Sequence, residues 1–183
     1  NRPTRLIYPD GEQVDMNYDG FGVDQLAVDG QNLVNRVDHN GRGQITLIDR
    51  AQAADTQYQY GEIGGPASHL WRLTTLQHGP ASNPISQYQY HYDAAGNISA
   101  LNERGQPDQT LSYDSLNRLL ERQIDGVTDR VYAYDPLGNI SSMQKDGQQT
   151  TYQYGGDSPH AVTATTGAVV GTYTYDGNGN MVE

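Results

Sequence analysis

The feature that most limits the fold of this chain is a tandem repeat in which Tyr-Asp is followed by a short turn rich in Gly and Asn. Tyrosines at positions 92, 113, 134, 154 and 175 mark its register, so the spacing is 20 or 21 residues. The clearest copies are Tyr92–Ile98, Tyr134–Ile140 and Tyr175–Met181, and Tyr113–Leu119 fits less closely. A fixed period of this size predicts repeating units that bury apolar surface only against their neighbours.

These residues resemble the RHS/YD-repeat family, whose motif is Tyr-Asp, two variable residues, Gly-Asn or Gly-Arg, and then an aliphatic residue. Degenerate copies at Tyr18–Gly22 and Val37–Arg42, the second with Val in place of Tyr, extend the resemblance towards the N-terminus. Ser158–Thr163 resembles a variant repeat of the same family. We therefore expect a single repeat array over residues 1–183, with repeats near 8–30, 31–60, 84–105, 106–126, 127–147, 148–168 and 169–183. The residues expected to carry the repeat structure are Tyr18, Asp19, Tyr92, Asp93, Gly96, Asn97, Tyr113, Asp114, Tyr134, Asp135, Gly138, Asn139, Tyr154, Tyr175, Asp176, Gly179 and Asn180.

Each repeat has the pattern of a β-hairpin. Tyrosines alternate with other residues before the Asp, as in Tyr88–Tyr92 and Tyr152–Tyr154, and this period of two places the rings on one face of a strand. The Asp can accept hydrogen bonds from backbone N–H groups two residues on, and Gly supplies a positive φ. A second turn is expected halfway through each repeat, at the sites Glu103–Gln106, Asp125-Gly126, Asp146–Gln148 and Thr166-Gly167.

These hairpins predict an all-β fold of tandem YD-repeat hairpins. Open twisted sheets rarely exceed about ten strands without curling or splitting. We therefore expect a long curled antiparallel sheet that is a fragment of a hollow β-shell.

Residues 61–83 interrupt the register and are expected to form an insertion or enlarged loop. Leu70–Gln77 could form a strand or a short helix, and Gly64–Pro66 and Gly79-Pro80 mark loops on either side. Two interpretations stay open: an enlarged loop or extended hairpin, and a partner-docking element that carries the only tryptophan.

Composition argues against a deep core and against nucleic acid as a partner. The chain has one Phe, one Trp and 14 Tyr, so buried apolar surface would be lined largely by tyrosine and aliphatic residues. A net charge of −11 repels phosphate backbones. No apolar run approaches the roughly 20 residues that span a bilayer, and the absence of cysteine excludes disulfides. Neither end has the pattern of a capping repeat, so we expect a segment of a longer polypeptide.

Candidate catalytic and metal sites are weak. Asp135–Gly138 matches the first four positions of an Asp-Pro-x-Gly autoprotease signature known in the family, but Asn139 occupies the fifth position, where a large apolar residue is required. No partner carboxylate is evident, so we interpret this segment as a turn. Asp38–Gly41 and Asp176–Asn180 resemble the start of a calcium loop without its Glu at the twelfth position. We expect no catalytic residue, cofactor or metal.

The resemblance implies a structural role. In bacterial members, YD repeats form a shell around a C-terminal toxin domain, built by one chain in Rhs effectors and jointly with a second subunit in insecticidal toxin complexes. The implied partners are therefore a toxin cargo in the same polypeptide and a second shell subunit, with secretion or delivery by a bacterial secretion system. The alternative is a carbohydrate-binding or cell-surface adhesion module like the teneurins, in which exposed tyrosine ladders stack on sugar rings. An enzyme fragment is a third hypothesis.

Overall fold

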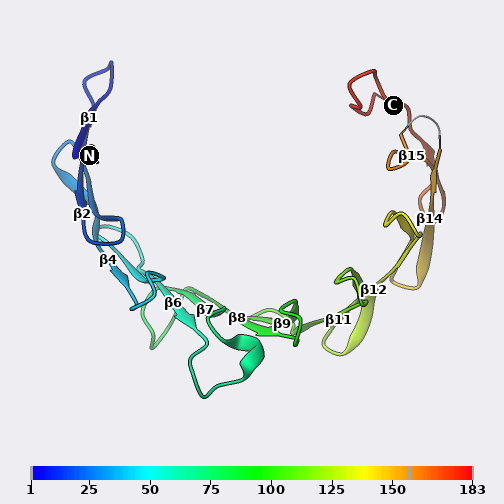
Figure 1. Cartoon of the computed structure of the whole chain (residues 1–183), viewed down its shortest axis with the longest axis horizontal. Helices are drawn as coiled ribbons and strands as arrows, with labels where there is room; N and C mark the ends of the chain where they lie inside the picture. The colour runs from blue at the N-terminus through cyan, green and yellow to red at the C-terminus, as the bar shows by residue number, and fades with distance from the viewer. Residues whose placement is uncertain (1, 156–157, 183) are drawn as a thin grey trace. The chain divides into compact units, whose positions relative to one another are not determined.

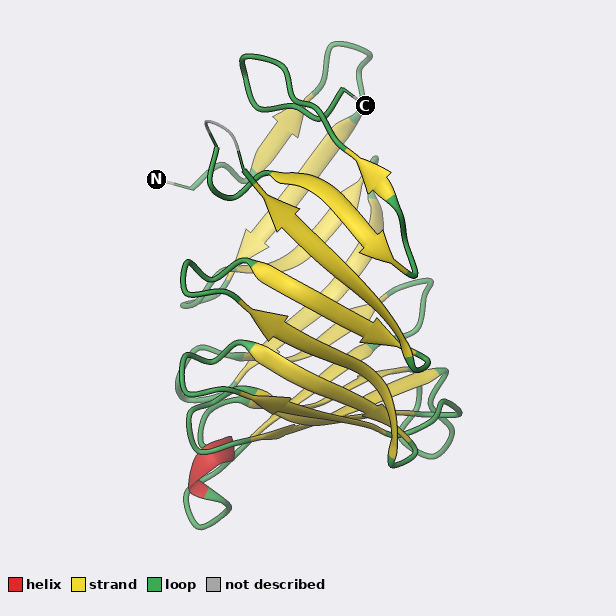
Figure 2. Cartoon of the chain, turned by 90° about the vertical axis from the view of Figure 1, so that its right-hand side faces the viewer, coloured by secondary structure: helices red, strands yellow, loops and turns green. Residues whose placement is uncertain are grey.

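The computed structural model describes residues 2–155 and 158–182, and nearly all of its regular structure is β-strand. In chain order the strands are β1 (Arg5–Ile7), β2 (Gln13–Tyr18), β3 (Val23–Val28), β4 (Gln31–His39), β5 (Ile45–Arg50), β6 (Thr56–Tyr60), β7 (Leu73–His78), β8 (Ser86–Tyr92), β9 (Ile98–Glu103), β10 (Gln109–Tyr113), β11 (Leu119–Ile124), β12 (Val127–Tyr134), β13 (Ile140–Lys145), β14 (Gln148–Tyr154), β15 (Val162–Gly167) and β16 (Gly171–Thr172). A 3₁₀ helix, η1 (Ala67–His69), lies between β6 and β7 and is drawn in red in Figure 2. The all-β prediction of tandem hairpins is confirmed.

The strands follow one another in the sheet in the order of the chain, and the pairs are antiparallel (Figure 1). The chain divides into two compact units, residues 1–96 with 101–106 and residues 97–100 with 107–183. Most hairpins follow one plan, with one turn after the Tyr-Asp position and one halfway to the next. Because consecutive strands pair, each repeat depends on its immediate neighbours alone.

The halfway turns are two-residue hairpin turns wherever the sequence has Asp-Gly between strands. Asp29 and Gly30 have φ of 48° and 78°, and Asp125-Gly126 and Asp146-Gly147 have nearly the same values. Positive φ at both positions defines a type I′ turn, whose twist matches that of the flanking strands. At Thr166-Gly167 the reversal falls later than expected, because Gly167 still belongs to β15 and β16 begins at Gly171.

A β-bulge lies beside several of the repeat turns. In β12 and β13, Ala133 pairs with Ser142 but Tyr134 pairs with Ile140, so Ser141 is the extra residue. The same shift by one residue occurs at Tyr18, Tyr113 and Tyr154. A bulge increases the local right-handed twist, so these four hairpins have the same increase in twist next to their turns.

The two faces of the sheet differ, and the structure lacks a hydrophobic core. In β14 the side chains of Thr150, Tyr152 and Tyr154 are buried or half-buried, whereas Gln149, Thr151 and Gln153 on the other face are exposed. Among the described residues no hydrophobic side chain is buried, and the five buried side chains are all polar. They are Thr56, Gln77, Asn139, Thr150 and Thr165. The described chain is therefore a single layer of sheet, held chiefly by backbone hydrogen bonds.

The irregular segment of the sequence occupies the place of one Tyr-Asp turn. Tyr60 pairs with Leu73, and the Gly61 N–H donates to the Arg72 carbonyl at 3.0 Å, so residues 61–72 form an enlarged turn between β6 and β7. From Leu73 onward the segment is an ordinary strand, and a second loop connects it to β8 at Ser86. Of the two structures expected for Leu70–Gln77, the strand is therefore the one that forms.

The described residues hold no helix with the length and apolar character needed to cross a membrane.

Candidate functional site

The repeated turn is the most regular site in the molecule. In the turn after β12, Asp135 Oδ1 accepts hydrogen bonds from the backbone N–H groups of Leu137 and Asn139, both at 2.9 Å. The Asn139 side-chain amide donates to the other carboxylate oxygen at 2.9 Å, and the Asp135 N–H donates to the Asn139 carbonyl. Gly138 has φ 90° and makes the reversal possible. Each part of the Tyr-Asp-x-x-Gly-Asn motif thus has a specific hydrogen-bonding or conformational role.

The same geometry recurs with different residues. Asp176 binds the N–H groups of Asn178 and Asn180, with Gly179 at φ 84°. Asp114 binds two N–H groups in the same way and pairs with the Arg118 side chain. In that turn Asn117 takes the left-handed conformation with φ 61°, which Asn tolerates better than most residues. In the first unit, Asp93 Oδ1 accepts a hydrogen bond from the Gly96 N–H at 2.8 Å.

The hydroxyl of each motif tyrosine joins one hairpin to the hairpin before it. It donates to the carbonyl oxygen of the aliphatic residue that follows the preceding Tyr-Asp turn, as in Tyr134 to Leu119 and Tyr154 to Ile140, both at 2.9 Å. Strand pairing between β13 and β14 ends at Ser142 and Thr151, so the Ile140 carbonyl lies beyond the ladder. The tyrosine hydroxyl therefore supplies a hydrogen bond between the two hairpins at the point where backbone pairing between them stops. Tyr113 to Ile98 and Tyr175 to Val162 follow the same rule. Tyr60 and Tyr92 donate to Ile45 and Leu73, which follow the turn at Asn40 and the enlarged turn, and Tyr18 donates to Pro3, which precedes β1.

Titration behaviour follows from these contacts. Hydrogen bonds from the Arg118 backbone lower the pKa of Asp114, and hydrogen bonds from Asn180 lower the pKa of Asp176. For Asp135, burial opposes the shift but is outweighed by donors in its own turn, chiefly the Asn139 side chain, so its pKa is also lowered. Burial raises the pKa of Tyr134 and Tyr154. The carboxylate and the neutral phenol are therefore the forms that the folded repeat favours.

Side chains of the turns also connect one turn to the next along the same edge of the sheet. The Asn97 amide donates to Asn117 Oδ1 at 2.9 Å. Asn139 donates to the Pro159 carbonyl at 3.0 Å and lies 2.7 Å from the His160 ring nitrogen Nδ1. The Asn of the motif thus serves its own turn and the following one, which explains why Asn139 is among the few buried side chains.

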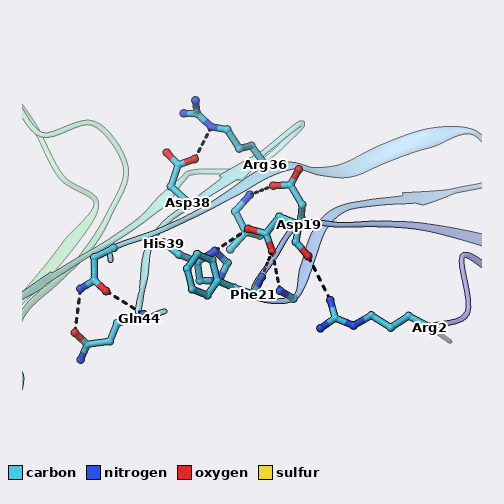
Figure 3. A network of polar contacts seen from close by, with 11 residues as sticks. Arg2, Asp19, Phe21, Arg36, Asp38, His39 and Gln44 are labelled. Carbon is cyan, nitrogen blue, oxygen red and sulfur yellow. Dashed lines mark hydrogen bonds and ion pairs between the residues drawn. The ribbon is translucent and has the colours of Figure 1, made fainter. Parts of the chain in front are cut away.

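The N-terminal repeats depart from the pattern, and Figure 3 shows their polar network. The turn expected at Val37–Arg42 lies two residues later, because Asn40 rather than Asp38 accepts the N–H groups of Arg42 and Gln44. His39 thus stands in the tyrosine position and Asn40 in that of the aspartate. The sequence pattern predicted Asp38 in the aspartate position, and that register is wrong.

The imidazole of His39 is buried and makes a different connection from the tyrosines. Its Nδ1 lies 3.2 Å from a carboxylate oxygen of Asp19, an ion-pair distance without the alignment of a hydrogen bond. Asp19 accepts the N–H groups of Phe21 and Gly22, which lower its pKa (Figure 3). The Phe21 ring lies 5.0 Å from the imidazole. At this position an aromatic and carboxylate cluster replaces the tyrosine-to-carbonyl bond.

A groove of about 750 Å³ lies between the turn at Asn40 and the enlarged turn at 61–72. Its lining includes Arg42, Tyr58 and Trp71. The Arg42 guanidinium stacks on the indole, 3.5 Å from the ring centroid. The sequence indicated the segment of Trp71 as a possible docking element but gave no signal for Arg42, because the contact depends on where the enlarged turn folds back.

The catalytic candidate and one of the two metal candidates lie in turns, whereas Asp38, at the start of the other metal candidate, lies in β4 and pairs with Arg36. The carboxylate of Asp135, in the Asp-Pro-x-Gly match, is engaged by donors of its own turn. The Asp176 carboxylate is engaged in the same way. In the parts of the chain that the structure describes, no three His, Asp or Glu side chains are grouped so that they could hold a metal ion.

Comparison with known proteins agrees with this geometry. A family model described as teneurin YD-shell matches residues 88–183. Among solved structures, one of the Photorhabdus luminescens Tc holotoxin pore, with a mutation in TccC3, superposes with a TM-score of 0.68 at 16% identity, covering 97% of this chain and 11% of that chain. A crystal structure of TcdB2-TccC3 gives 0.65 and 16%, with 93% of this chain and 11% of that chain covered. No curated protein matches. This chain thus spans about a tenth of the structures that it resembles, and its resemblance to YD-repeat proteins is confirmed.

Proposed function

The chain belongs to the teneurin YD-shell family, and we propose that it is a non-catalytic wall segment of a bacterial toxin of the Rhs or Tc type, which encloses a C-terminal toxin domain of the same polypeptide. The observation that carries the proposal is the single layer of sheet without a buried hydrophobic side chain among the described residues. A sheet of this kind has surface on both faces and cannot fold around an interior of its own. It suits a wall that separates a lumen from solvent.

The side-chain hydrogen bonds between successive hairpins support this role. Tyrosine hydroxyls donate hydrogen bonds to the preceding hairpin, and asparagine side chains donate to the next turn. Neighbouring repeats are therefore held together by short polar contacts. Such contacts hold a thin sheet together without a second layer. A second shell subunit would complete the enclosure if this chain is of the Tc type, and secretion or delivery by a bacterial secretion system follows from a toxin role.

The carbohydrate-binding alternative depended on exposed tyrosine ladders. In the structure thirteen of the fourteen tyrosines are half-buried, and Tyr8 is the exposed one. The motif rings lie against neighbouring strands, with their hydroxyls engaged. The tyrosines therefore serve the wall, and we do not favour a ladder that stacks on sugars.

Protease protection in the complete natural polypeptide tests the proposal. A Cβ at Gly167 would lie 2.3 Å from the Gln149 carbonyl oxygen, so Gly167→Val should force β14 and β15 apart. Gly177, where a Cβ meets open space, gives the matched control Gly177→Val. We expect the domain downstream of the repeats to resist protease in the parent and in Gly177→Val, and to be cleaved in Gly167→Val. Rapid cleavage in the parent would refute enclosure.

A further inference from the structure

The groove beside Trp71 is a large concavity in the first unit that the regular repeat of hairpins does not explain. Its volume of about 750 Å³ lies in the range of about 300 to 1,000 Å³ typical of ligand pockets. Its lining includes Asn40 and Arg42 from the first turn, Tyr58 and Tyr60 from β6, and Ile63 and Trp71 from the enlarged turn. The enlarged turn creates it, since an ordinary Tyr-Asp turn is too short to form that side.

The backbone at Trp71 is held in a conformation that large residues avoid. Its φ is 63°, in the left-handed region where bulky side chains are rare. Three hydrogen bonds keep it there: Trp71 N–H to the Gly61 carbonyl at 2.9 Å, Gly61 N–H to the Arg72 carbonyl at 3.0 Å, and the Gln44 amide to the Trp71 carbonyl at 2.9 Å. Strain that the surrounding structure maintains tends to cluster at binding sites. Here it presents the indole to the groove.

Arg42 is positioned by the indole and is otherwise unengaged. Its guanidinium carbon lies 3.5 Å from the centroid of the Trp71 ring, and its side chain makes no hydrogen bond or ion pair within residues 2–155 and 158–182. In contrast, Arg118 and Arg122 pair with carboxylates in their own hairpins. Stacking fixes the plane of the guanidinium and leaves its N–H edge free, which is the arrangement that binds a planar anion through two parallel hydrogen bonds.

We propose that this groove binds an acidic residue of a peptide, with its carboxylate on Arg42 and a neighbouring aliphatic side chain against Trp71 and Ile63. Ile63 is 83% exposed and offers apolar surface next to the charge. Glu62 in the lining and the net charge of −11 disfavour a doubly charged phosphate more than a singly charged carboxylate. The proposal concerns the groove alone and is independent of the wall role.

Trp71 is the only tryptophan of the chain, so its fluorescence reports on this groove directly. The probe is acetyl-Leu-Glu-amide, titrated at pH 7 and physiological salt, with acetyl-Leu-Gln-amide and inorganic phosphate as comparisons. We expect a saturable change with the Glu peptide and binding at least about tenfold weaker with the Gln peptide, because a charge-assisted bidentate contact is lost. Arg42→Gln should weaken binding of the Glu peptide by a similar factor.

Two further variants separate the site from general charge and folding effects. Lys145→Gln removes one positive charge from a residue of the second unit that does not line the groove, and should leave binding unchanged. Arg42→Lys keeps the positive charge but loses the two parallel N–H donors of the guanidinium. It should therefore bind the peptide several-fold more weakly with an unchanged circular dichroism spectrum. Equal binding of the Glu and Gln peptides, tighter binding of phosphate, or an unchanged affinity in Arg42→Gln would each overturn the proposal.

Discussion

Removal of a single motif hydroxyl should weaken the contact between two successive hairpins, which we call a seam. Tyr154→Phe deletes the hydrogen bond of 2.9 Å to the Ile140 carbonyl and leaves that carbonyl half-buried without its donor. A hydrogen bond of this kind contributes about 1 kcal/mol net. The expected loss corresponds to about a fivefold change in the local opening equilibrium and a fall of roughly 2 to 4 °C in melting temperature for a chain of this size.

Hydrogen exchange followed by mass spectrometry measures this effect locally. Peptides covering β13 and β14 should exchange about fivefold faster in Tyr154→Phe, because the hydroxyl holds the end of the seam where strand pairing has stopped. Tyr152→Phe is the matched control: it lies on the same strand and face, is also half-buried, and its hydroxyl makes no hydrogen bond among the described residues. Equal acceleration in both variants, or none in Tyr154→Phe, would refute the idea that the hydroxyl carries the seam.

The remaining predictions concern the turns and their titration. Gly138→Ala should lower the stability by about 1 to 2 kcal/mol in denaturant unfolding, since φ is 90° there, whereas Gly177→Ala, without positive φ or close neighbours, should change it little. The pKa of Asp114 is lowered on folding, so its stabilisation is present above its ordinary value of 3.8 and is lost as the pH falls through the folded pKa. Thermal melts of Asp114→Asn should therefore lose less stability than the parent between pH 5 and pH 3, and an identical slope would contradict this. The pKa of Tyr134 is raised on folding, so Tyr134→Phe should lose less stability than the parent as the pH rises above about 10, as followed by circular dichroism.

The hairpins could be predicted from sequence because their determinants are local. Asp-Gly between strands gives the type I′ turn at Asp125, and Tyr-Asp with Gly three residues after the Asp gives the turn at Asp135. The tyrosine bonds could not be predicted, because donor and acceptor belong to successive hairpins and meet only after the bulge sets their register. The two-residue shift of the turn at His39 was not predicted either. Asn40 accepts the hydrogen bonds that Asp accepts in the other turns, whereas the nearby Asp38 matched the family motif better.

The groove was even less accessible to sequence reasoning. The composition of residues 61–72 indicated a loop and contained the only tryptophan, but nothing in it indicates that Trp71 would fold back onto Arg42 of another turn. Such a contact forms where an irregular turn lies beside a regular hairpin turn, and its geometry depends on the conformations of both turns.

The absence of a shared interior among the described residues has a consequence for how a repeat array of this kind changes in length. In a globular domain, an inserted segment must be fitted into a packed volume that every other element also touches. Here an inserted or deleted repeat would create one new seam, made of a tyrosine hydroxyl, a carbonyl and a turn asparagine, all supplied by the motif itself. Gene duplication can therefore lengthen the sheet one repeat at a time, and each intermediate keeps the same hydrogen bonds between its hairpins.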